Sequence, residues 1–78
     1  MHQVPPEICV TAERAEWAYK LAKLAQQMDD LAVEIAAARI LDAFALCEMI
    51  PIGLIERAER FVIDNNLQEV IEYRQPVT

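Results

Sequence analysis

The sequence lacks several residue types on which enzymes commonly depend. Its 78 residues include no serine, one glycine (Gly53) and one histidine (His2). Without serine the most common hydroxyl nucleophile is absent, and a single glycine cannot build a glycine-rich loop that binds phosphate. Cys47 falls on an apolar helix face, where a buried thiol is inert. We therefore expect no enzymatic activity, no catalytic residues and no cofactor.

Patterns typical of metal binding and of secretion are also missing. Cys9 and Cys47 are far apart and form no Cys-X-X-Cys pair. Asp29, Asp30 and Glu34 form a small acidic cluster, but it has no neighbouring histidine and no matching carboxylate motif elsewhere, so we expect a solvated patch and no metal site. No charged start followed by an apolar core is present, which predicts no signal peptide, a cytoplasmic location and free thiols.

Long uncharged apolar runs are absent, and so is an excess of positive charge. The most apolar segment, residues 31–50, contains Glu34, Arg39, Asp42 and Glu48. A bilayer-spanning helix rarely accepts four charges, so we expect no membrane segment. The net charge is -6, from 13 acidic and 7 basic residues. Because this charge repels phosphate backbones and acidic lipid surfaces, we expect neither nucleic acid nor membrane as a partner.

Apolar residues, in contrast, are abundant. They make up 55% of the sequence, whereas about 45–50% is usual. Residues 1–78 are enough for a single small domain, and small domains bury only a modest part of their surface. This apolar content in so short a chain indicates association with another chain.

A long helix is the main structural prediction. Neither glycine nor proline occurs between Pro6 and Pro51, and residues 11–49 are rich in alanine and leucine. Thr11 is the expected N-cap of this helix, which would be about 58 Å long. Its first half carries an apolar stripe at heptad spacing, formed by Trp17, Leu21, Leu24, Met28, Leu31 and Ile35. From about Leu31 the helix is apolar on two sides, which is typical of a helix buried between neighbours.

A competing interpretation divides this helix in two. Asp29 or Asp30 could be the N-cap of a second helix, because the apolar stripe changes sides near that point. The absence of glycine and proline favours the continuous helix, which we therefore predict. A bend near Asp29 and Asp30 is compatible with it.

The remaining segments are short. Residues 1–10 are expected to form a flexible or extended arm. Pro51 ends the long helix and Gly53 allows the chain to reverse, so residues 52–65 should form a second, antiparallel helix. Asn66 and Glu69 have the spacing of a capping box, which predicts a short third helix over residues 67–74. The expected fold is all-α, a helical hairpin with a short C-terminal helix.

These lengths predict a dimer. As a helix, residues 52–74 would span about 35 Å, too little to cover a rod of about 58 Å. The first part of the stripe, from Trp17 to Met28, would lie beyond their reach. Burying one such side chain stabilises by about 1.5–3 kcal/mol. The simplest solution is a homodimer in which two hairpins form a four-helix bundle, and a helix of another protein would serve equally.

The function favoured by these observations is protein binding without chemistry. We expect a small bacterial or mobile-element regulator or inhibitor that occludes the surface of a partner protein of unknown identity. Tryptophan is enriched at binding hot spots, and the expected partner-binding residues are Trp17, Tyr19, Lys20, Leu21, Leu24 and Met28. One alternative is a DNA-binding regulator that reads DNA with residues 54–63, although the charged residues of that segment sum to zero. Another alternative is a structural subunit of a larger complex.

Overall fold

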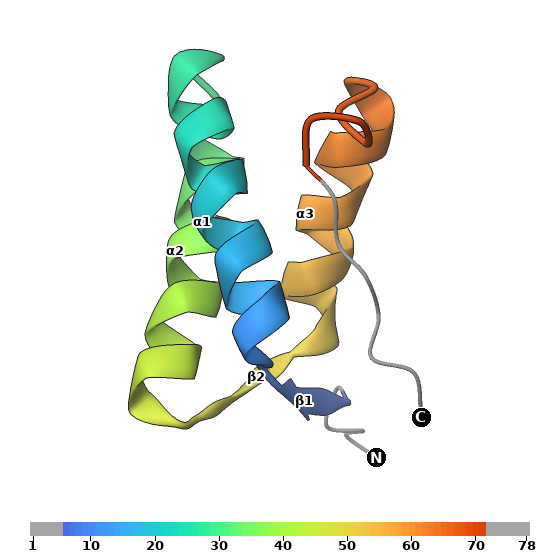
Figure 1. Ribbon diagram of the computed structural model, residues 1–78. Coiled ribbons are helices and arrows are strands. Elements are labelled where there is room, and N and C mark those ends of the chain that lie inside the picture. Colours follow the sequence, from blue (N-terminus) through green and yellow to red (C-terminus); the bar gives the residue numbers. More distant parts are fainter. Residues whose placement is uncertain (1–5, 72–78) are drawn as a thin grey trace.

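Three helices and a small two-stranded sheet make up the described part of the protein. The computed structural model describes residues 6–71. The helices are α1 (Ala12–Gln27), α2 (Leu31–Leu46) and α3 (Ile52–Asp64), and the strands are β1 (Glu7–Cys9) and β2 (Met49–Pro51). The helices run up, down and up, with α1 in front of α2 and α3 beside them (Figure 1). Because α2 packs against both other helices, it is the central element of the fold.

The predicted continuous helix over residues 11–49 is wrong, because the chain turns back between α1 and α2. Asp29 adopts a left-handed conformation with φ of 56°. The amide of Asp30 donates to the carbonyl of Ala25, and the amide of Asp29 donates to that of Gln26. These two bonds form a Schellman motif, which ends a helix by satisfying its last carbonyl groups.

The competing interpretation, with an N-cap at Asp30, is confirmed. The Asp30 carboxylate accepts a hydrogen bond from the Val33 amide at 3.2 Å, which satisfies a donor in the first turn of α2. The expected N-cap of α1 is confirmed as well, since the hydroxyl of Thr11 accepts from the Arg14 amide at 3.1 Å. Side-chain caps therefore begin α1 and α2, whereas α3 follows Pro51 without a side-chain cap.

The two strands pair in antiparallel fashion and join the start of the chain to the α2–α3 connection. Glu7 lies opposite Pro51, Ile8 opposite Ile50 and Cys9 opposite Met49. Part of the predicted arm is thus an extended strand, and residues 1–5 lie outside the described part of the chain. The helix that precedes β2 ends at Leu46 instead of residue 49, with Cys47 in the left-handed conformation.

The second predicted helix, 52–65, closely matches α3, whereas the predictions on either side of it need correction. Gly53 lies inside the first turn of α3 and has no positive φ, so the reversal occurs at Cys47 and not at the glycine. The predicted helix over residues 67–74 is wrong for its described part. Residues 67–71 form a single turn in which the Ile71 amide donates to the Leu67 carbonyl, and residues 72–74 lie outside the described chain.

The core lies between the three helices. Its largest fully buried side chains are Leu21 of α1 and Ile40 of α2, and Trp17 is 4% exposed. The expectation that Trp17 and Leu21 cannot be covered by their own chain is therefore wrong, because α2 folds back along α1. The molecule measures 38 × 30 × 22 Å, well below the length of the predicted rod. The fold is a small helical one, and pairing into a four-helix bundle stays a prediction.

Candidate interaction surface

The most unusual surface of the protein is the side of α2 that faces away from α1 and α3. Leu31, Ile35 and Leu46 are 67%, 55% and 66% exposed, although they are among the most apolar residues. We call this side the outer face of α2. It comprises Leu31, Ala32, Ile35, Ala38, Arg39, Asp42, Ala45 and Leu46, all of them exposed.

Helical periodicity explains why this face is exposed. The buried residues of α2 are Val33, Ala36, Ala37, Ile40 and Ala43, which recur every three or four positions and form one side of the helix. Leu31, Ile35 and Leu46 fall on the opposite side. A helix that is apolar on all sides is normally enclosed by neighbours. In the described chain α2 has neighbours on its inner side only, and its outer face is exposed.

The partner-binding residues predicted from the sequence do not form one surface. Trp17 and Leu21 are buried in the core, Leu24 is half-buried, and Tyr19, Lys20 and Met28 are exposed. The guanidinium carbon of Arg14 lies 4.7 Å from the centre of the Trp17 ring, a cation–π geometry that supports Trp17 from within the same helix. Trp17 and Leu21 thus stabilise the fold and are not available to a partner protein.

The exposed members of that set lie among charged neighbours. The ammonium of Lys23 lies 4.6 Å from the centre of the Tyr19 ring. The Lys20 ammonium lies 3.6 Å from a carboxylate oxygen of Glu16, in the helical spacing that stabilises by a few tenths of a kcal/mol. This side of α1 is a solvated surface with one aromatic ring. It offers a partner much less apolar area than the outer face of α2.

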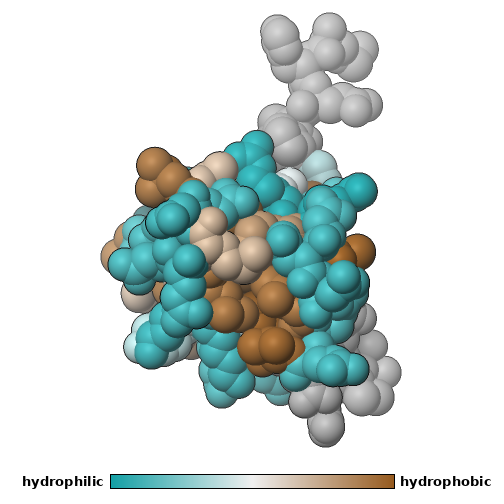
Figure 2. Space-filling view, turned by 90° about the horizontal axis from the view of Figure 1, so that it is seen from above, coloured by the Kyte–Doolittle hydropathy of each residue, from teal (hydrophilic) through white to brown (hydrophobic). Residues whose placement is uncertain are grey.

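A second apolar area lies at the end of the molecule where α1 and α3 finish. Seen from that end, apolar residues occupy the middle of the surface and hydrophilic residues surround them (Figure 2). Among the apolar residues of this part of the chain, Met28 and Val70 are exposed, while Leu24 and Leu67 are half-buried. Of the predicted residues in this part of the chain, Met28 is therefore the more accessible and Leu24 the less accessible.

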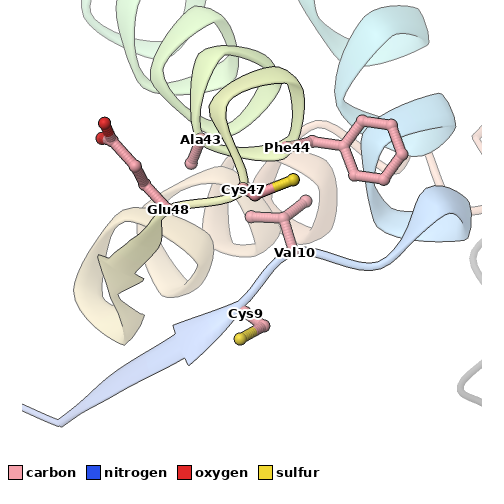
Figure 3. Close-up of a pocket in the computed structure, with 6 residues that line it drawn as sticks. All are labelled: Cys9, Val10, Ala43, Phe44, Cys47 and Glu48. Atoms are coloured by element: carbon pink, nitrogen blue, oxygen red, sulfur yellow. The ribbon is translucent and has the colours of Figure 1, made fainter.

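A small pocket lies near the other end, where β1 meets the end of α2. Its volume is about 210 Å³, and it is lined by Cys9, Val10, Ala43, Phe44, Cys47 and Glu48. The side chain of Val10 points toward Cys47, whereas that of Cys9 points away (Figure 3). Pockets that hold small-molecule ligands usually measure about 300–1,000 Å³. This one is too small for such a ligand, and both thiols are exposed and free.

Other kinds of site find little support in the described chain. Over residues 6–71 no three His, Cys, Asp or Glu side chains come close enough together to hold a metal ion. None of α1, α2 and α3 has both the length and the apolar character needed to cross a bilayer.

The sequence pattern indicated that α2 has a second apolar side, but it did not indicate what covers that side. Ile35 and Leu46 lie on one side of α2 while Val33 and Ile40 lie on the other, and this pattern predicts contacts on both sides. Sequence periodicity cannot tell whether the second contact comes from the same chain or from another. The structure shows that α1 and α3 together cover only one of the two sides.

Comparison with protein-family models, with curated proteins and with solved structures finds no match for this chain.

Proposed function

We propose that the chain is a non-enzymatic protein-interaction module that docks a partner protein on the outer face of α2. The observation that supports this proposal is the exposure of Leu31, Ile35 and Leu46, each more than half exposed on one side of the central helix. Burying a leucine or isoleucine stabilises by about 1.5–3 kcal/mol. Three such side chains supply a driving force for association that the chain does not use itself. By covering a surface of its partner, the module regulates what that surface can bind.

The alternative of a DNA-binding regulator has less support. The exposed side of α3 carries Glu56 as well as Arg57 and Arg60, and the whole chain has a net charge of -6. Proteins that bind duplex DNA present a basic surface to the phosphates. The mixed charges of α3 and the acidic chain oppose such contact.

Photo-crosslinking within cells of the source organism tests the proposal. A photoreactive amino acid replaces Ala38, which lies in the middle of the outer face of α2. We expect covalent adducts of this chain with a protein, detected by immunoblot and identified by mass spectrometry. The adducts should disappear with Ile35→Glu, because a carboxylate in the middle of the face cannot be buried without a partner.

A matched control is available in α3. Ile63 is 58% exposed, close to the 55% of Ile35, but it belongs to a different helix. Ile63→Glu should leave the adducts at position 38 intact. Absence of any adduct, or equal loss with both variants, contradicts docking on the outer face of α2.

A further inference from the structure

We infer that the protein docked on the outer face of α2 is a second copy of the same chain, with the two α2 helices packed antiparallel across a two-fold axis. This inference rests on the proposed function and names the partner. Two-fold homodimers are the most common oligomers, and their interface must be self-complementary. The charges and the apolar residues of the outer face meet that requirement.

The charge of the face differs from that of the whole protein. The outer face of α2 carries one cation, Arg39, and one anion, Asp42, and is therefore neutral, although the chain has a net charge of -6. A face selected by a basic partner would concentrate acidic groups. A neutral face with one charge of each sign is instead complementary to a copy of itself.

The positions of these residues define one register. We place the two-fold axis between the two antiparallel helices, at the level midway between Ile40 and Leu41. Arg39 and Asp42 are equally far from this level along the helix, so Arg39 of each copy is level with Asp42 of the other. The same axis is equally far from Ile35 and Leu46. Each copy thus places its isoleucine beside the leucine of the other, and symmetry repeats both contacts.

Two registers with the axis nearer the start of α2 are less favourable. An axis at Ala38 brings Glu34 level with Asp42, and like charges across an interface repel. An axis half a residue further along the helix places Asp42 beside Ile35, where the carboxylate loses water without gaining a partner. Shifting the axis to the point between Ile40 and Leu41 removes both conflicts.

The outer face also permits close approach. Ala32, Ala38 and Ala45 are small and exposed, so the two helices can meet without bulky side chains holding them apart. One face of a 16-residue helix offers less area than the roughly 800 Å² per partner of a standard interface. We therefore expect a reversible dimer whose equilibrium is measurable between about 1 µM and 1 mM.

Charge exchange tests both the dimer and its register. Sedimentation equilibrium is measured for the wild-type chain, Arg39→Asp, Asp42→Arg and the double variant with both substitutions. We expect each single substitution to weaken the dimer at least tenfold, because like charges then face each other twice. The double variant should regain the dimer. An equimolar mixture of the two single variants should form a heterodimer, since each then meets the opposite charge.

Controls separate folding from association. Arg39 and Asp42 are exposed, so circular dichroism should show unchanged helix content in every variant. Ile35→Glu should give a monomer, whereas Ile63→Glu should leave the dimer intact. A wild-type chain that stays monomeric up to 1 mM overturns the inference, as does a dimer that does not respond to charge exchange.

Failure of the inference can be distinguished from failure of the proposed function. If the chain is monomeric while a probe at Ala38 crosslinks a different protein in an Ile35-dependent way, the proposed function stands and only the identity of the partner is wrong. If the chain is monomeric and the same probe yields no adduct, both fail.

Discussion

At the scale of single residues, the helix ends are the most telling feature. Within two residues of the end of each helix lies a residue with positive φ, and these residues are Asp29, Cys47 and Asn66. Glycine is the usual residue in this position, but the only glycine of the chain lies inside α3. Asp and Asn tolerate the left-handed conformation comparatively well. A cysteine has no such advantage, and its Cβ makes the conformation costly.

Replacing this cysteine by glycine should stabilise the protein. Cys47 has φ of 55° and ψ of 41° and is exposed, so Cys47→Gly relieves backbone strain while removing few contacts. Part of the gain is lost because glycine has more conformational freedom in the unfolded chain. We expect a net stabilisation of about 0.5–1 kcal/mol, measured by urea denaturation at a low protein concentration.

Cys47→Ala provides the control for this prediction. It removes the thiol but keeps Cβ, so the strain remains and stability should not rise. Equal stabilisation by alanine and glycine would show that the thiol, and not the left-handed backbone, is the unfavourable group.

At the scale of helices and strands, the sequence identified capping residues better than helix ends. Thr11 and Asp30 are residue types with a known preference for the first position of a helix, and both act as caps. The end of α1 carried no comparable signal, because Asp29 replaces the glycine that would mark a Schellman motif. The change in the apolar stripe near Asp30 was the remaining clue, and a bend in a continuous helix would produce the same pattern.

The two strands were difficult to predict for a different reason. β1 and β2 have three residues each, too few for an alternating pattern to stand out. They form where the fold brings residues 7–9 beside residues 49–51. Their pairing depends on tertiary structure, which local sequence does not encode.

The cap at Asp30 should contribute measurably to stability. Asp30→Ala removes the acceptor for the Val33 amide, and we expect a loss of about 1 kcal/mol in the free energy of unfolding. Asp30→Asn keeps an oxygen in the same place and should lose much less. If the two variants are equally stable in urea denaturation, the side-chain cap is not what starts α2.

At the scale of the whole molecule, chain reversal at Asp29 decides which apolar residues are core and which are surface. With α2 folded back on α1, Trp17 and Leu21 are enclosed, and the uncovered side shifts to Leu31, Ile35 and Leu46. The prediction that an apolar helix side needs an external partner depends on how much of the helix the rest of the chain is long enough to cover. Which side stays uncovered depends on the chain reversal between α1 and α2. Because the sequence predicted a continuous helix there, the candidate site could not be placed correctly from the sequence.

Substitution of Trp17 tests this division between core and surface. If Trp17 were a contact for a partner, Trp17→Ala would weaken association and leave the fold intact. In the structure it is 4% exposed, and truncating a buried tryptophan to alanine costs about 3–5 kcal/mol. A chain of this length has a total stability of roughly 4–12 kcal/mol. We therefore expect Trp17→Ala to lower the midpoint of thermal unfolding strongly or to unfold the chain, as followed by circular dichroism.

The neighbouring Tyr19 supplies the contrast that makes this test decisive. Tyr19 belongs to the same helix but is 53% exposed, and surface substitutions usually change stability by less than about 0.5 kcal/mol. Tyr19→Ala should therefore unfold almost like the wild-type chain. A Trp17→Ala variant as stable as Tyr19→Ala would mean that the indole is not part of the core. It would then be free to contact a partner, and α2 would have to cover α1 less fully than it does in this fold.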